Sequence, residues 1–377
     1  MTCALGNNEA SARPHGQPND TASSAVSASH DARQAQIAEF LEAAALMPNS
    51  ASPLAGDASA RRYLRVATTS GRAVLMDAPR PANESMAFFV SVTTWLRARG
   101  LSAPAVLAAD LETGLLLLED LGDALFARVL ATLSAPGAQE TALYTAATDL
   151  LAALPENEAP PGIAPYDEAT LLREARLATD WWWPAAAGAA VSSEAIATYE
   201  AVLRTSLAPA LETELAPVCV LRDYHAENLL WLPDREGAAR IGLLDYQDAL
   251  LGHPAYDLVS LLEDARRDTS AALREAMVAR YLARRGLGGE AAAHFRVAYA
   301  ALGAQRNLKI IGIFARLALR DGKPRYLDLI PRVWAHLQRD LAHPALAPLA
   351  ALVARHIPPP GPAQLAAVAA KTGEGAP

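Results

Sequence analysis

Residues 218–231 read VCVLRDYHAENLLW, and residues 241–245 read IGLLD. Both segments start with an apolar run typical of a buried strand, and each run leads to a carboxylate, Asp223 in the first and Asp245 in the second. An amide, Asn228, follows Asp223 by five positions. Asp and Asn are also common turn residues, so this pair alone is consistent with an ordinary polar turn. The apolar strands predicted on both sides favour a catalytic or binding site over an ordinary turn.

The spacing of these three residues is that of a phosphoryl-transfer site. Asp223 and Asn228 match the protein-kinase loop H-R-D-x-x-x-x-N, in which the Asp orients and deprotonates the attacking hydroxyl and the Asn holds magnesium. Asp245 stands where a second aspartate would bridge magnesium to the nucleotide phosphates. Magnesium prefers hard oxygen ligands. The pattern therefore predicts Asp223 as the catalytic base, Asn228 and Asp245 as metal ligands, and ATP and Mg²⁺ as cofactors.

The wider region resembles the aminoglycoside phosphotransferase superfamily of small-molecule kinases. The resemblance is carried by RDYHAENLL (222–230), LLDYQD (243–248) and GHPAYDL (252–258). Within the superfamily, these motif sequences are similar to those of the kinases that phosphorylate the anomeric hydroxyl of N-acetylmuramate and N-acetylglucosamine in bacterial cell-wall recycling. The resemblance implies an α+β, bilobal protein-kinase-like fold, with a small β-rich N-terminal lobe and a larger, mostly α-helical C-terminal lobe. It also implies that Asp257 supports the catalytic loop.

Composition narrows the class of protein. A chain of 377 residues with 52% hydrophobic residues can bury a sizeable core in two or three lobes. The formal net charge is -8, with both signs interspersed, which argues against nucleic acid as a partner. Cys3 and Cys219 offer no disulfide framework or zinc spacing, and no apolar run is long enough to span a membrane. We therefore expect a cytoplasmic protein without membrane partners, most simply a monomer.

The pattern along the chain predicts four parts. Residues 1–30 are rich in Ser, Ala, Asn and Pro and lack apolar periodicity, which indicates a disordered extension. Residues 31–120, which open with a helix capped by Asp31, form the nucleotide-binding N-terminal lobe. Residues 121–360 form the C-terminal catalytic and substrate lobe, and residues 361–377 a flexible tail.

The phosphates of ATP are expected to meet the first lobe. A turn of small residues around Ser59 leads into a strand with Arg62 and Arg65, and small residues let backbone N–H groups approach an anion. No lysine precedes Lys309, so the phosphate-binding lysine of the protein-kinase pattern is missing. Ser59 and either arginine are our candidates for ATP binding, because arginine grips phosphate bidentately. Equally, these arginines could be solvent-facing strand residues. Glu84 resembles the helix-C glutamate, but its lysine partner is missing.

A run of four leucines, residues 115–118, leads into Glu119 and Leu121. This run resembles the hinge between the two kinase lobes. The adenine edge of ATP would then bind the backbone near Glu119 and Leu121, a contact that depends little on side-chain identity. The alternative is a buried edge strand.

Aromatic residues are candidates for the sugar site. Trp181, Trp182 and Trp183 are consecutive, and neighbouring residues on a helix point about 100° apart, so they cannot all face one core. At least one is expected to be exposed or to line a cleft, with Trp182 as the candidate for stacking on a sugar. Core packing explains the other two.

Cationic residues recur on a largely apolar helical segment further along the chain. Arg306, Lys309 and Arg316 could meet a carboxylate on the substrate. The alternative for each is a solvated helix face or a salt bridge.

The function expected is an ATP-dependent sugar 1-kinase for N-acetylmuramate and N-acetylglucosamine. The acidic residues Glu263, Asp264 and Asp268 keep an aminoglycoside, or another small hydroxyl metabolite, as the alternative substrate. The missing lysine keeps open a nucleotide-binding but inactive pseudokinase.

Overall fold

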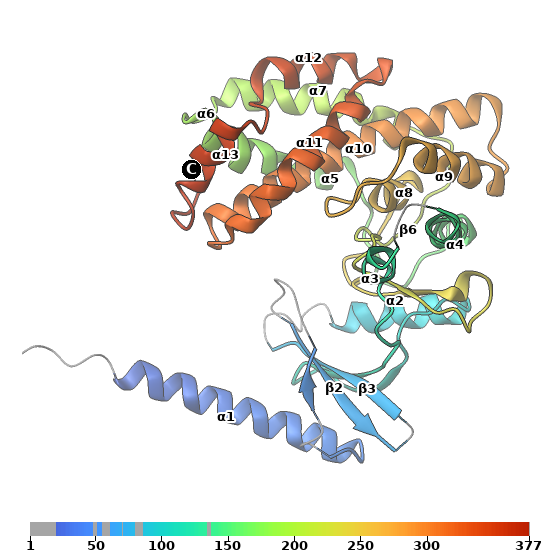
Figure 1. The fold of residues 1–377 in the computed structure, drawn as a ribbon, viewed down its shortest axis with the longest axis vertical. Coiled ribbons are helices and arrows are strands. Elements are labelled where there is room, and N and C mark those ends of the chain that lie inside the picture. Colours follow the sequence, from blue (N-terminus) through green and yellow to red (C-terminus); the bar gives the residue numbers. More distant parts are fainter. Residues whose placement is uncertain are drawn as a thin grey trace, which may run out of the picture. The chain divides into compact units, whose positions relative to one another are not determined.

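The computed structural model describes residues 20–47, 51–54, 61–69, 71–79, 86–133 and 137–376, with the backbone alone for residues 20–30. The chain divides into two compact units, which Figure 1 shows as ribbons. The first consists of Met1–Asn83 and Leu107–Leu118, and the second of Glu84–Val106 and Glu119–Pro377.

A five-stranded sheet dominates the first unit. The strands lie in the order β1, β2, β3, β5, β4, and the pairs β1–β2 and β2–β3 are antiparallel. In the second of these pairs Arg62 lies opposite Asp77. The strands are β1 (Ser52–Pro53), β2 (Arg62–Thr68), β3 (Gly71–Asp77), β4 (Val106–Asp110) and β5 (Leu115–Glu119).

The core of the first unit lies between this sheet and helix α1 (Asp20–Ala43). Ile37 and Leu41 are one turn apart, so they share a face of α1. They pack against buried side chains of β2, β3 and β5, namely Val66, Ala73, Leu75, Leu115 and Leu117. The helix begins at Asp20 instead of Asp31, so the expectation of disorder is wrong for residues 20–30. Alanine, the strongest helix former, recurs in that segment.

The second unit is mostly helical, with two short antiparallel strand pairs, β6–β9 and β7–β8. The strands are β6 (Val218–Val220), β7 (Leu229–Trp231), β8 (Ile241–Leu243) and β9 (Leu250–Gly252). The α-helices are α2 (Met86–Ala98), α3 (Phe126–Ala131), α4 (Ala138–Ala153), α5 (Glu168–Leu177), α6 (Trp183–Ala187), α7 (Ser193–Leu211), α8 (Ala255–Leu262), α9 (Ala271–Arg284), α10 (Gly289–Leu319), α11 (Ile330–Leu341), α12 (Ala347–His356) and α13 (Pro362–Ala369). One π-helical turn (Ala178–Trp182) and three 3₁₀ turns (Gly237–Arg240, Pro324–Leu329 and Pro344–Leu346) complete the described elements.

Helix α10 is the centre of this unit. It contacts α5, α7, α8 and α11, and Figure 1 shows α11 running beside it. Gly312 allows α10 to lie directly on the backbone that follows α5, because a Cβ atom at this position would be 2.1 Å from the carbonyl carbon of Leu177. Helix α10, which carries Arg306 and Lys309, is therefore packed tightly against this backbone.

Helix α2 belongs to the second unit, although the sequence placed it in the N-terminal lobe. The Thr93 hydroxyl lies 2.8 Å from the Tyr246 hydroxyl, and Phe89 stacks on Tyr246 with ring centroids 5.1 Å apart. These contacts join α2 to the segment that follows β8. The chain enters the second unit at Glu84, returns to the first at Leu107 and leaves it for the last time at Glu119.

Helix α13 (Pro362–Ala369) lies where the sequence predicted a flexible tail. Pro362 stands in the first turn of α13, where proline is well tolerated, and Val368 is buried. Beyond the helix, the N–H of Gly373 donates to the carbonyl of Ala318 at 3.3 Å, and the N–H of Gly375 to that of Leu319 at 3.1 Å. The tail is thus fastened to the end of α10.

The predicted α+β class is confirmed, with the larger sheet in one unit and most helices in the other. Within the described part of the chain, no helix combines the length and apolar character that crossing a membrane requires.

Replacing Gly312 by alanine tests the packing of α10. The added methyl group would collide with backbone atoms, which cannot rotate away, so we expect a loss of about 1–3 kcal/mol in the free energy of unfolding. Thermal denaturation measures this loss. Gly288→Ala is the control, because its Cβ meets nothing within 4 Å, and its loss should not exceed about 1 kcal/mol from the weaker helix cap. Equal losses in both variants would contradict the packing described.

Candidate active site

The loop between β6 and β7 carries Asp223 in a series of tight turns. The N–H of Asp223 donates to the carbonyl of Leu221 at 2.9 Å, the N–H of His225 to that of Asp223 at 3.1 Å, and the N–H of Asn228 to that of His225 at 2.9 Å. Arg222 has a φ of +69°, a left-handed conformation that is rare for residues other than glycine. The side chain of Asp223 therefore projects from a sharply bent segment of backbone, and contacts with the surrounding structure must maintain that bend.

Asp257, in the first turn of α8, stabilises this bend through hydrogen bonds to the backbone. Its carboxylate oxygens accept the N–H of Leu221 at 2.6 Å and the N–H of Arg222 at 2.9 Å, and its side chain is buried. Burial raises the pKa of Asp257 to about 7, although both backbone donors favour the ionised form. Ser260, on the same helix, donates its hydroxyl to the carbonyl of Arg222 at 3.1 Å. Both backbone polar groups of Arg222 are thereby satisfied.

A second acidic residue contacts the far side of the loop. The buried carboxylate of Asp264 accepts the N–H of Ala226 at 3.3 Å and that of Arg266 at 2.8 Å. In the sequence Asp264 belonged to an acidic set considered for cationic substrates. The structure shows it engaged with backbone N–H groups instead, a contact that the sequence pattern does not reveal.

Asn228 and Asp245 lie next to each other, as their positions in the motif predicted. The amide nitrogen of Asn228 donates to the carbonyl of Asp223 at 3.0 Å and lies 3.4 Å from a carboxylate oxygen of Asp245. The other carboxylate oxygen of Asp245 accepts from the Gln247 amide at 2.8 Å. Since the nitrogen of Asn228 is engaged, its amide oxygen is the atom suited to a cation.

These two residues fit magnesium better than a metal held wholly by protein. Among the described residues, no group of three or more His, Cys, Asp and Glu side chains could hold a metal ion. Magnesium commonly takes one or two protein ligands and completes its shell with water and substrate phosphates. The donor set of Asn228 and Asp245 matches that mode of binding.

Two cationic residues of α10 act on Asp223. Arg306 and Lys309 are three residues apart, so they share a face of the helix. Burial by itself would raise the pKa of Asp223, but the charges of Arg306 and Lys309 lower it below its ordinary value. Burial also lowers the pKa of His225. At neutral pH, Asp223 is therefore ionised and able to accept a proton, and His225 is neutral.

The two cations differ in their partners. Lys309 forms an ion pair with Glu174 at 3.0 Å, and its ammonium group lies 3.4 Å from the Tyr256 hydroxyl. Arg306 is 5% exposed and donates to the Ser260 hydroxyl at 2.6 Å. Within the described part of the chain, Arg306 has no carboxylate within ion-pair distance. A buried guanidinium without a carboxylate is the group most ready to receive an anion from a ligand.

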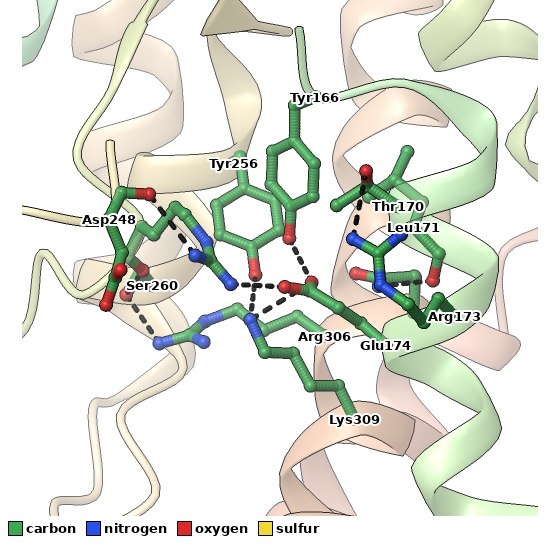
Figure 2. A network of polar contacts seen from close by, with 12 residues as sticks. Tyr166, Thr170, Leu171, Arg173, Glu174, Asp248, Tyr256, Ser260, Arg306 and Lys309 are labelled. Atoms are coloured by element: carbon green, nitrogen blue, oxygen red, sulfur yellow. Dashed lines mark hydrogen bonds and ion pairs between the residues drawn. The ribbon is translucent and has the colours of Figure 1, made fainter. Parts of the chain in front are cut away.

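Glu174, on α5, lies at the centre of the polar network in Figure 2. It forms ion pairs with Lys309 and Arg222, and it accepts a hydrogen bond from the Tyr166 hydroxyl. Arg222 also donates to the carbonyl of Asp248 at 3.2 Å. Sequence reasoning missed Glu174, because nothing in the helical pattern of α5 distinguishes it from a surface glutamate.

The candidates for nucleotide phosphates receive little support from the structure. Ser59 and Glu84 lie outside the described residues. Arg62 is engaged by Asp77, whose buried carboxylate accepts from the Nε atoms of both Arg62 and Arg33 at 2.9 Å. The phosphate role expected for Arg62 would require breaking that ion pair. Arg65 lies on the same strand, β2, and is partly buried.

Glu119 and Leu121 lie where the chain enters the second unit. The Glu119 carboxylate accepts from Arg97 at 3.0 Å and from Arg235 at 2.7 Å, and its N–H donates to the carbonyl of Ala105 at 2.8 Å. The side chain of Glu119 therefore fixes the segment. Among the described residues, the N–H of Leu121 has no hydrogen-bond partner, so this group is suited to an acceptor on a ligand.

Two of the expected substrate residues lie elsewhere. Trp182 is wholly buried and donates its indole N–H to the carbonyl of Pro358 at 2.9 Å, so it has no ring face for a sugar. Of the three tryptophans, Trp181 is the partly exposed one. Arg316 lies ten residues beyond Arg306 on α10, which separates them by about 15 Å along the axis. Both placements argue against the roles expected from the sequence.

Comparison with known proteins agrees with this geometry. The model of the phosphotransferase enzyme family matches residues 50–296. The chain is 41% identical over 362 residues to the N-acetylmuramate/N-acetylglucosamine kinase of Caulobacter vibrioides, covering 86% of this chain and 97% of that protein. It is 36% identical over 312 residues to the enzyme of the same name from Pseudomonas aeruginosa, covering 81% and 88% of the two chains.

A solved structure shares the fold. The ternary complex of streptomycin, ATP and the aminoglycoside phosphotransferase APH(2'')-IIa has a TM-score of 0.51 and 15% identity, covering 74% of this chain and 89% of that chain. The family model covers more than half of the chain, and the two relatives align over most of their own length. This membership supports kinase, or more broadly phosphotransferase, activity. The predicted family and kinase-like fold are confirmed, and the chain belongs to the phosphotransferase enzyme family.

Proposed function

We propose that this protein is an ATP-dependent kinase that phosphorylates the anomeric hydroxyl of N-acetylmuramate and N-acetylglucosamine. The observation that carries the proposal is the grouping of an ionised Asp223 with Asn228, Asp245 and the buried Arg306, which pairs with no carboxylate among the described residues. The names of the two relatives support the same substrate class. The sugar 1-phosphates would serve cell-wall recycling in the cytoplasm, with the enzyme acting as a monomer.

The reaction requires positioning and charge neutralisation more than covalent help. Asp223 accepts the proton of the C1 hydroxyl while that oxygen forms a bond to the γ-phosphorus of ATP. The bond from the γ-phosphorus to the bridging oxygen breaks, and ADP leaves with the electron pair. When bound, Mg²⁺ would neutralise the phosphate charge that develops. Asn228 and Asp245 are the residues that would hold it.

Arg306 is the residue proposed to recognise the carboxylate of N-acetylmuramate. Its guanidinium is buried, and its charge acts on Asp223, so it belongs to the environment of the base. Lys309 is already paired with Glu174, so it contributes less to an incoming anion. N-acetylglucosamine, which lacks the carboxylate, would leave Arg306 unused but keep the same reacting hydroxyl.

The acidic residues that kept an aminoglycoside in view are occupied within the protein. Glu263 is buried and accepts from the Asn307 amide at 2.8 Å. Asp264 holds backbone N–H groups, and Asp268 pairs with Arg332 at 2.8 Å. A polycationic substrate would find these carboxylates engaged, so an amino sugar with an anionic group fits the site better.

The adenine of the nucleotide is proposed to bind through backbone groups, and its phosphates to meet residues other than the lysine that this chain lacks. The N–H of Leu121 and the backbone at Glu119 would bind the adenine edge, and Ser59 and Arg65 remain candidates for the phosphates. Side-chain identity matters little for such contacts, which explains why the sequence gives no strong signal for them.

Phosphorus NMR of the products, with a reducing-end assay, tests the proposed reaction. After incubation with Mg-ATP and N-acetylmuramate or N-acetylglucosamine, we expect a glycosyl 1-phosphate signal and loss of reducing ends. An aminoglycoside is the parallel incubation and should give no phosphorylated product. A phosphomonoester that retains the reducing end would contradict the anomeric assignment. A protein that binds ATP but phosphorylates no hydroxyl would be the pseudokinase.

Asp223→Asn tests the base. An amide cannot accept the hydroxyl proton, so kcat should fall by about 10²- to 10⁴-fold while the affinity for ATP stays roughly the same. Steady-state kinetics and ATP titration measure both. Asp234→Asn, at an exposed position after β7, is the matched control and should keep wild-type activity. Full turnover by the Asp223 variant would assign the base elsewhere.

Arg306→Gln tests carboxylate recognition. The ratio of kcat/KM for N-acetylmuramate to that for N-acetylglucosamine should fall by about 10- to 100-fold, since a charge-assisted hydrogen bond contributes about 1.5–3 kcal/mol. Removing this cation also raises the pKa of Asp223, so the ratio is measured at pH 8, where the base is ionised in both proteins. Arg296→Gln, on the same helix but paired with Glu275, is the control. An unchanged ratio in the Arg306 variant would exclude the assignment.

A further inference from the structure

We propose that Glu174 is a positioning residue that keeps the catalytic loop in its working conformation by holding the side chain of Arg222. The proposal rests on the function proposed for Asp223. It assigns a role in that reaction to helix α5, which contributes nothing to the catalytic motif itself.

The first observation concerns the backbone of Arg222. Its left-handed φ is unfavourable for an arginine, so the conformation persists only if surrounding contacts hold it. Asp257 and Ser260 bind its backbone N–H and carbonyl. The side chain is the third point of attachment, and among the described residues Glu174 is the carboxylate paired with it.

The second observation concerns Glu174 itself. Burial would raise the pKa of its carboxyl, but the charges of Lys309 and Arg222 lower it, so Glu174 is ionised. The Tyr166 hydroxyl donates to one of its oxygens, and the Arg222 guanidinium lies 5.7 Å from the centre of the Tyr166 ring. A buried carboxylate with this many partners has a fixed position, so it can fix what it binds.

The third observation is the position of Arg222 beside Asp223. Arg222 precedes Asp223 directly, and its side chain also donates to the carbonyl of Asp248. Releasing the guanidinium from Glu174 would leave one backbone carbonyl as its remaining hydrogen-bond partner within the described residues. The bend that aims Asp223 would then relax, and a displacement of about 1 Å at a reacting group is enough to cost about 100-fold in rate.

Hydrogen exchange tests the proposal without reference to any substrate. In Glu174→Gln we expect the amides of residues 221–228 to exchange about tenfold faster than in the wild type, with the N–H groups of Leu221 and Arg222 among them. Glu168→Gln is the matched control, because it removes an exposed ion pair with Arg204 from the same helix. Unchanged exchange of these amides in the Glu174 variant would overturn the proposal, whatever reaction the protein catalyses.

A double-mutant cycle separates the route through Arg222 from a route through Lys309. Glu174→Gln should lower kcat by about 10- to 100-fold with the KM for ATP roughly unchanged. If Glu174 acts through Arg222, the double variant E174Q/R222Q should be no slower than R222Q alone, whereas E174Q/K309Q should be slower than K309Q. Losses that multiply in E174Q/R222Q would overturn the proposal. Absence of turnover in the wild type would instead refute the proposed function, and hydrogen exchange would still decide the role of Glu174.

Discussion

The site depends on one buried carboxylate and the two backbone N–H groups that it accepts. Asp257 binds Leu221 and Arg222 at the end of β6, where the chain turns sharply. Without it, two donors would be buried unpaired and the left-handed bend would lose its main support. All eight residues of α8 are buried, so the carboxylate is held by a rigid element. The direction in which Asp223 leaves the backbone follows from this arrangement.

Of the cationic residues near Asp223, Arg222 and Lys309 form ion pairs within the protein, whereas Arg306 remains available to an anionic ligand. Glu174 forms ion pairs with both Arg222 and Lys309, and in doing so connects α5, the loop after β6 and α10. Arg306 is buried and pairs with no carboxylate among the described residues, and its charge lowers the pKa of Asp223. Paired charges in a protein interior mainly fix geometry, whereas an unpaired one creates a demand for an anion. This division is the physical basis for expecting an anionic sugar.

The proximity of Asp223, Asn228 and Asp245 was predictable, because these residues lie in short segments whose spacing encodes the turns that join them. Glu174 was not, since only the tertiary fold brings α5 to the catalytic loop. Trp182 was misjudged because the tertiary fold buries its ring and brings the carbonyl of Pro358, far along the chain, to its indole N–H. The pairing of Arg62 with Asp77 was also missed, because it depends on the register of β2 with β3, in which the two residues oppose each other. The early start of α1 and the helical tail had weaker signals in their alanine content.

The most direct test of the account is a crystal structure of the protein with Mg²⁺, a non-hydrolysable ATP analogue and N-acetylmuramate. We expect the C1 hydroxyl within hydrogen-bond distance of the Asp223 carboxylate, the metal on Asn228 and Asp245, and the sugar carboxylate on Arg306. A different hydroxyl facing Asp223, or a metal bound away from Asn228 and Asp245, would contradict the central claim that this loop performs anomeric phosphoryl transfer.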